Sequence, residues 1–144
     1  MGRVTKMEDK KMINEIMIIA LTIAGEAAGE PRAGKVMVGE VIANRAKERK
    51  QTPKFVCLSK NQFSCWNGAR GKKLRRSLKS LEKQNSPAWQ DCKAIAKEIC
   101  KRGYQPVSPA QYYYNPALCS PSWARSMDIV ASVGQHLFLV EKRS

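Results

Sequence analysis

Residues 16–31 read IMIIALTIAGEAAGEP, an apolar run that leads into two glutamates, two glycines and a proline. Within this run Ile16, Ile19 and Ile23 recur at the spacing of a buried helical face. Apolar residues extend almost all round the helix, which predicts a central position in the fold rather than a surface one. The glycines indicate that the helix ends near residues 25–29.

Three more helices are expected from the pattern of apolar residues and end signals. A second helix should begin at Pro31, because a proline at the first helical position lacks only an N–H group that would have no partner there. It should end in the basic run at residues 45–50. A third is expected around the leucines of residues 74–81. A fourth should run from Ser86 as N-cap to a stop at Gly103.

Helical periodicity fails between residues 51 and 71, where Phe55–Leu58 is expected to form one short strand. Four prolines make the chain after Gly103 loop-rich as far as residues 129–140. The sequence contains no repeat, linker or low-complexity segment. It therefore predicts a single, mainly α domain over residues 1–144, with a small irregular or β region.

The charge of the chain is its most unusual bulk property. Its 144 residues include 26 Lys and Arg against 12 Asp and Glu, giving a formal net charge of +14. A hydrophobic fraction of 43% is enough for a real core, which argues against wholesale disorder. An excess of positive charge as large as +14 usually implies a polyanionic partner, such as nucleic acid, anionic lipid or a bacterial cell-wall polymer.

The cysteines and the N-terminal region indicate what the chain is not expected to contain. The five cysteines are scattered and include no C-x-x-C pair, so we expect reduced thiols, no disulfide and no metal site. No cofactor is expected either. The apolar run of residues 16–24 is too short to span a membrane. Acidic residues around it do not fit the basic and apolar regions of a signal peptide, so no targeting segment is expected.

Glu26 is the first candidate for chemistry, because it lies where the apolar helix meets the glycine-bounded turn. A carboxyl group there would be partly desolvated, which favours the neutral acid, and a neutral acid can protonate a glycosidic oxygen. The alternative is that Glu26 and Glu30 form an ordinary solvated pair at i, i+4. Spacing alone favours this alternative.

Two segments combine aromatic rings with amides and hydroxyls in the irregular regions. Flat rings beside amides are suited to a carbohydrate groove, where C–H faces stack on rings and polar groups bind hydroxyl and N-acetyl groups. Stacking of RNA bases is a competing use, and closing the core of a loop-rich domain is a third. The candidate substrate-binding residues are Gln62, Phe63, Ser64, Trp66, Tyr112, Tyr113, Tyr114 and Asn115.

Residues 70–83 carry seven basic side chains and one acid, Glu82; we call this segment the basic stripe. With its leucines facing inward, the basic residues should line the outer face of a helix and bind an anion. Lys72, Lys73, Arg75 and Arg76 are the candidates for wall attachment. His136 is a lone histidine near an apolar tail, and its spacing indicates a packed histidine rather than a ligand.

The order of the motifs resembles that of the cell-wall hydrolases related to the spore-cortex-lytic enzyme. The resemblance begins with Ala24-Gly25-Glu26-Ala27-Ala28-Gly29-Glu30-Pro31 and continues through Val41-Ile42-Ala43-Asn44-Arg45. It covers roughly residues 12 to 140. Four shorter motifs follow in the family's order: Phe63-Ser64-Cys65-Trp66, Tyr113-Tyr114-Asn115-Pro116, Pro121-Ser122-Trp123-Ala124 and Gly134-Gln135-His136-Leu137-Phe138.

The resemblance implies a lysozyme-like, mainly α fold that cleaves peptidoglycan between N-acetylmuramic acid and N-acetylglucosamine. It also implies that Glu26 is the catalytic acid and that His136 joins the substrate-binding set. The chain departs from the family pattern at Ala28, where an arginine is expected, and in the basic stripe.

A small domain with neither an export signal nor a separate wall-binding domain resembles a bacteriophage endolysin. Such an enzyme would stay in the host bacterial cytoplasm until lysis and then reach the cell wall. We expect a monomer without a membrane span or a specific nucleic-acid partner, bound to peptidoglycan and anionic envelope polymers.

The scarcity of acids favours a lytic transglycosylase over a hydrolytic muramidase. Ordinary glycosidases need two carboxylates flanking the bond. The direction of Glu30 is uncertain, Glu40 is distant along the second helix, and Asp91 and Glu98 read as surface residues. Asp128 is the serious second candidate. One glutamate suffices if the sugar's own C6 hydroxyl is the nucleophile.

Two other classes of function remain open at this level. A basic nucleic-acid-binding module would explain the charge and the tyrosines but leaves the Glu26 motif without a role. A non-enzymatic cationic wall-binding protein would act through the basic stripe alone and would not depend on Glu26.

Overall fold

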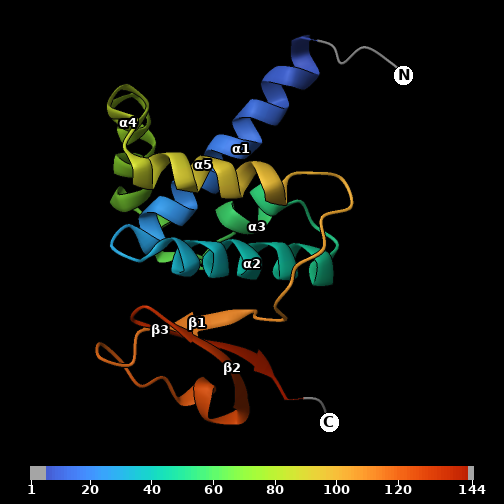
Figure 1. The fold of residues 1–144 in the computed structure, drawn as a ribbon, viewed down its shortest axis with the longest axis vertical. Coiled ribbons are helices and arrows are strands. Elements are labelled where there is room, and N and C mark those ends of the chain that lie inside the picture. The colour runs from blue at the N-terminus through green and yellow to red at the C-terminus, as the bar shows by residue number, and fades with distance from the viewer. Residues whose placement is uncertain (1–5, 143–144) are drawn as a thin grey trace.

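The first helix, α1 (Lys6–Ala27), occupies the centre of the helical part of the fold. The computed structural model describes residues 6–142, apart from the side chains of residues 8, 9 and 12. Ile19 and Ile23 are fully buried, as the periodicity predicts. Figure 1 shows the N-terminal turns of α1 extending away from the body of the protein. No helix in the described part is long and apolar enough to cross a membrane.

Two further helices, α2 (Arg32–Arg49) and α5 (Pro87–Ile99), pack against α1. Pro31 is the N-cap of α2, so the helix begins at Arg32, one position after the start expected from the sequence. The start of α5 is confirmed, because the Ser86 side chain accepts a hydrogen bond from the backbone N–H of Trp89. The helix itself ends at Ile99, and Gly103, with a φ of 79°, follows in the turn beyond it.

The expectation of a strand at Phe55–Leu58 is wrong, because these residues belong to a helix, α3 (Pro53–Leu58). The Thr52 side chain caps this helix by accepting from the Phe55 N–H, and Pro53 fits its first turn. A four-residue apolar run carries too little periodicity to distinguish a strand from one helical turn. The N-terminal signal at Thr52 and Pro53 was the better guide.

The basic stripe forms most of α4 (Ala69–Gln84), as expected. Its three leucines, Leu74, Leu78 and Leu81, are half-buried against the core. Just before it, a single 3-10 turn, η1 (Ser64–Trp66), connects α3 to α4 and contacts α1.

A three-stranded antiparallel sheet forms the second layer of the fold, below α2 in Figure 1. Its strands are β1 (Tyr112–Tyr114), β2 (Met127–Val133) and β3 (His136–Glu141), in the order β1-β3-β2, and a 3-10 turn, η2 (Ser122–Ser126), precedes β2. In the register, Tyr113 lies opposite Phe138. Gly134 turns the chain from β2 to β3 with a φ of 57°.

Polar side chains of α2 fix the segment that leads into the sheet. Glu40, only 3% exposed, accepts hydrogen bonds from the N–H groups of Val107 at 2.6 Å and Ser108 at 3.0 Å. Asn44 donates to the carbonyls of Ser108 and Ala110 at 2.7 and 2.9 Å. These contacts set the position at which β1 enters the sheet and hence where its tyrosines lie.

Candidate active site

Glu26 lies in the last turn of α1, and three other residues donate hydrogen bonds to its carboxylate. Its Oε2 atom accepts from the Cys65 N–H at 3.1 Å and from the Ser64 hydroxyl at 3.3 Å, both in η1. Its Oε1 atom accepts from the Tyr113 hydroxyl in β1. The side chain is half-buried. Segments far apart in the sequence therefore hold one carboxylate in a fixed orientation.

The close approach of η1 to α1 depends on two residues near the C-terminal end of α1, Thr22 and Gly25. Thr22, fully buried, donates to the Ile18 carbonyl at 2.8 Å and accepts from the Trp66 indole N–H at 2.8 Å. At Gly25 a Cβ atom would come within 2.7 Å of the Cys65 Cβ, so a side chain would push η1 away. A glycine at residue 25 is thus needed to bring the Cys65 N–H to Glu26.

The tyrosine that bonds Glu26 is held in its neutral form. Burial, followed by the nearby negative charge of Glu26, raises the pKa of the Tyr113 hydroxyl well above its ordinary value. The hydroxyl therefore stays a hydrogen-bond donor over the whole neutral and alkaline range in which proteins are usually studied.

Arg45 is a buried cation that braces the segments on either side of the site. It is 9% exposed and donates to the backbone carbonyls of Gln111 at 2.7 Å and Gln62 at 3.2 Å. Its guanidinium lies over the rings of Phe63 and Tyr112, with its central carbon 5.0 and 5.4 Å from their centroids. Burial lowers its pKa, although the residue stays charged at neutral pH.

Glu30 does not form a solvated pair with Glu26, so the alternative favoured by spacing is wrong. Glu30 is 9% exposed and accepts from the Gln135 N–H at 3.1 and 3.3 Å. The His136 Nδ1 atom lies 2.5 Å from Glu30 Oε1, within ion-pair distance. The break between α1 and α2 turns Glu30 inward toward the β2–β3 turn.

His136, which contacts Glu30, also contacts Tyr113, the residue whose hydroxyl donates to Glu26. Its ring packs edge-on against Tyr113 with a centroid distance of 5.3 Å. The expectation of a packed histidine is consistent with this placement, since its side chain is only 14% exposed. His136 nevertheless lines a cavity of about 490 Å³ together with Asn115 and Gln135.

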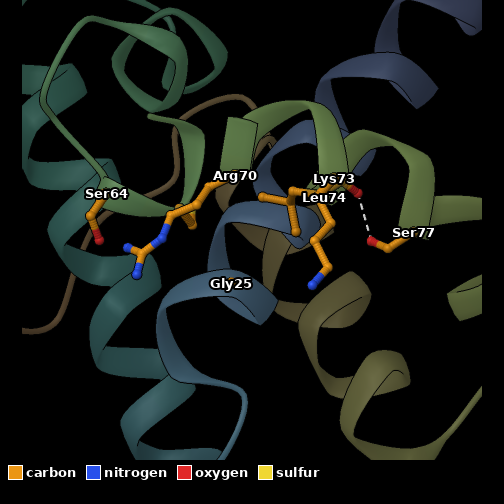
Figure 2. Close-up of a pocket in the computed structure, with 7 residues that line it drawn as sticks. Gly25, Ser64, Arg70, Lys73, Leu74 and Ser77 are labelled. Carbon is orange, nitrogen blue, oxygen red and sulfur yellow. Dashed lines mark hydrogen bonds between the residues drawn. The ribbon is translucent and has the colours of Figure 1, made fainter. Parts of the chain in front are cut away.

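A cavity of about 390 Å³ lies on the η1 side of Glu26. Figure 2 shows the side chains of Arg70 and Lys73 reaching over this cavity from α4. Gly25, Ser64 and Cys65 line it near Glu26, and Leu74 and Ser77 complete the α4 wall. Two residues of the basic stripe therefore face the candidate site, so the stripe is not confined to an outer face.

The structure separates the sequence-predicted substrate-binding residues into two groups. Ser64 and Tyr113 contact Glu26, and Asn115 and His136 line the cavity beside β3. The prediction for Phe63 is wrong, because a ring that is 2% exposed under Arg45 cannot contact a glycan.

The other predicted residues are engaged with the protein itself. Half-buried Trp66 bonds Thr22, and Gln62 accepts from Arg45 and Arg49. The Tyr112 and Tyr114 rings lie 5.8 and 5.9 Å from that of Trp123.

Several residues of the site were not selected from the sequence as functional. Gly25 and Cys65 act through the backbone, which no side-chain pattern indicates. Arg45 could have been found, because a charged residue one helical turn after Val41 and Ile42, on the side of the helix that they bury, demands buried partners. Arg70 belonged to the basic stripe but was not assigned to the site.

The other described acids that were considered as a second catalytic carboxylate either bind groups away from Glu26 or are exposed to solvent. Glu40 holds the loop before β1, Asp91 pairs with Arg32 at 2.6 Å, and Glu98 pairs with Lys101 at 2.7 Å. Asp128 is exposed on β2. Among the described residues, no group of three or more His, Cys, Asp or Glu side chains is arranged to hold a metal ion.

The fold has solved counterparts among spore enzymes. The catalytic domain of the germination-specific lytic transglycosylase SleB from Bacillus anthracis superposes with a TM-score of 0.63 at 24% identity, covering 88% of this chain and 94% of that domain. The catalytic domain of the Bacillus cereus SleB protein gives 0.61 at 24% identity, covering 89% and 91%. These similarities confirm the lysozyme-like, mainly α fold with its small sheet.

Several sequence relatives are spore cortex-lytic enzymes. Those of Bacillus cereus and Bacillus subtilis are each 26% identical over 127 and 128 residues, which is 87% of this chain but 44% and 37% of theirs. The chain thus spans less than half the length of these curated relatives. The family model for cell wall hydrolases matches residues 29–139, a range that begins just after Glu26. Because this match takes in most of the sequence, the chain belongs to the cell wall hydrolase family.

Proposed function

We propose that this protein cleaves the glycan strand of bacterial peptidoglycan between N-acetylmuramic acid and N-acetylglucosamine, with Glu26 as general acid and base. The observation that carries the proposal is the setting of Glu26. Its half-buried carboxylate receives three hydrogen bonds and adjoins a cavity lined by polar and basic groups. A second cavity is lined by His136, whose ring packs against Tyr113, the residue that donates to Glu26.

The arrangement of acids favours a lytic transglycosylase over a hydrolase. A two-carboxylate mechanism needs a second acid facing the first across the scissile bond. Glu30 is committed to the Gln135 N–H and to His136, and Asp128 is exposed on β2. Neither Glu30 nor Asp128 therefore supports a mechanism in which a second carboxylate acts as base or nucleophile opposite Glu26.

The reaction can proceed with one glutamate acting twice. Protonated Glu26 gives its proton to the glycosidic oxygen, and the bond from that oxygen to C1 of the muramic acid breaks. The carboxylate then takes the proton of the C6 hydroxyl while O6 bonds to C1. This closes a 1,6-anhydro ring and returns Glu26 to its protonated form. The donors Cys65 N–H, Ser64 and Tyr113 stabilise the carboxylate between the two transfers.

We further propose that the protein acts as a monomeric endolysin that stays in the host bacterial cytoplasm until lysis and then attacks the cell wall. The net charge of +14 supports this role, since teichoic acids and other envelope polymers are anionic. The exposed Lys72 and Arg76 on α4 supply attachment that does not depend on the cleavage site.

The decisive experiment is mass spectrometry of purified peptidoglycan digested with the full chain. Fragments ending in 1,6-anhydromuramic acid, lighter by one water than ordinary reducing ends, are the expected product. Ordinary muramic acid reducing ends would show that the reaction is hydrolysis, and the protein would then be a muramidase. Reducing ends on N-acetylglucosamine, or no soluble fragments at all, would contradict cleavage at the proposed bond.

A further inference from the structure

Two cations in the cavity beside Glu26 have no acidic partner in the described part of the protein. Arg70 and Lys73 line the cavity from one face of α4, one helical turn apart (Figure 2). Neither lies within ion-pair distance of a described carboxylate. The one acid of the basic stripe, Glu82, pairs instead with Lys93 at 2.8 Å. The cavity therefore presents positive charge that no ion pair among the described side chains neutralises.

We infer that Arg70 and Lys73 form a subsite that binds a carboxylate carried by the glycan strand, next to the bond at Glu26. This inference rests on the proposed function. Arg70 offers a planar fork of N–H groups that points toward Ser64, and Lys73 offers an ammonium farther along the same helix, so a carboxylate in this cavity has a cation to pair with at either position. The subsite selects strands whose muramic acid side groups are charged over strands in which they are neutral.

The position of the cavity identifies the source of the anion. Ser64 and Cys65 contact Glu26 and also line the cavity, so the cations stand beside the cleavage point. A muramic acid residue placed there carries a lactyl group whose carboxyl is either free or extended by a peptide with carboxylates of its own. No other group of the strand itself is anionic. Leu74 supplies an apolar wall for the lactyl methyl group or an alanine side chain.

Three forms of one substrate test the charge preference and separate its two sources. Strands freed of peptides by an amidase carry only lactyl carboxylates. Intact strands carry only peptide carboxylates. Peptide-free strands converted to methyl amides carry neither. Wild-type protein should cleave at least one charged form with a KM about tenfold below that of the methyl amide, and the preferred charged form identifies the source.

The variant Arg70→Gln/Lys73→Gln should abolish this preference by raising KM about tenfold for the charged form only. The control Lys97→Gln/Arg102→Gln removes the same charge from exposed positions that do not line the cavity, and it should keep the preference. Both pairs are exposed, so their melting temperatures should match the wild type. Dissociation constants measured in a Glu26→Gln background should follow the same order, independent of turnover.

Three results would overturn the inference while leaving the proposed function intact. The first is equal KM values for charged and methyl-amide strands with wild-type protein. The second is a loss of preference in the control as large as in the cavity variant. The third is competition by polyglycerol phosphate at concentrations matching the strand carboxylates, which would indicate a general anion site. Failure of the proposed function differs from all three, because no strand would be cleaved although the binding order could still be measured.

Discussion

Tyr113 donates a hydrogen bond to Glu26 across 87 residues of sequence, and this contact joins the sheet to the end of α1. The sheet therefore does more than cover the helices. Through Tyr113 it supplies the only described donor to Oε1, while the Cys65 N–H and Ser64 serve Oε2. Orientation of the carboxylate depends on both layers of the fold being in place.

Replacing Glu26 by Gln should lower turnover on peptidoglycan by about 10²–10⁴-fold, the range typical of general acid catalysis. The amide keeps the size of the side chain and an oxygen that can accept from the Cys65 N–H, so the melting temperature should stay near that of the wild type. Turbidity clearance and thermal unfolding measure the two quantities. A folded Glu26→Gln variant with undiminished cleavage would remove Glu26 from the mechanism.

Tyr113→Phe should reduce kcat more than it raises KM, because the ring remains packed against His136 while Oε1 loses its donor. We expect a loss of about 10-fold, the value of one hydrogen bond to a charged group. Tyr114→Phe, which lies on the same strand without contact to Glu26, is the matched control.

The pKa of Tyr113 also leads to an expectation for the pH profile. A raised pKa means that the hydroxyl keeps its proton, and hence its bond to Glu26, up to at least about pH 10. Wild-type activity should therefore show no loss attributable to this tyrosine below that pH. If Tyr113→Phe removed an alkaline limb seen between pH 8 and 10 in the wild type, this reasoning would fail.

The basic stripe should contribute salt-sensitive attachment to whole cell walls. Lys73 lines the cavity and Arg75 lies over the Trp66 ring at 5.3 Å, so Lys72→Gln/Arg76→Gln is the cleaner variant of the four-residue set. At low salt this variant should bind walls more weakly than the wild type, and the difference should shrink as ionic strength rises, because exposed charges are screened over about 8 Å at physiological salt. Co-sedimentation across a salt series measures this. A deficit independent of salt would assign the two residues a structural or catalytic role.

Reducing agents should leave activity and melting temperature unchanged, since all five cysteines are free thiols. Burial raises the pKa of Cys57 to about 12 and that of Cys92 to about 11, which keeps both thiols unreactive at neutral pH. Iodoacetamide should therefore label exposed Cys119 first, and Cys119→Ser should remove the fast phase. Rapid modification of Cys57 or Cys92 in folded protein would contradict this packing.

Gly134→Ala should destabilise the protein more than the matched change at Gly103. Both glycines have positive φ, 57° and 79°, so each substitution brings roughly 1 kcal/mol of backbone strain. At Gly134 the new Cβ would also lie 2.1 Å from Glu30 Oε2, whereas at Gly103 it meets nothing within 4 Å. Displacing a buried hydrogen-bonded carboxylate should add about 1–3 kcal/mol. Denaturant unfolding of the two variants tests the difference.

The sequence alone was sufficient for the central helix, the start of α5 and the inward leucines of α4, because each depends on periodicity or on capping within a few residues. It also singled out Glu26 from its place at the end of an apolar helix, and Ser64 and Tyr113 from the motifs around them. It failed at Phe55–Leu58, where the apolar run was too short to show a period and the cap at Thr52 decided the outcome.

Tertiary structure decided which of the candidate residues meet. The direction of Glu30, the burial of Phe63 and the approach of the Cys65 N–H depend on how α1, η1 and β3 pack, and Gly25 and Gly134 permit that packing by lacking a Cβ. Two cations of the basic stripe line the cavity for the same reason. Local patterns specify helices, caps and turns, but contacts between residues dozens of positions apart arise only when those elements share one core.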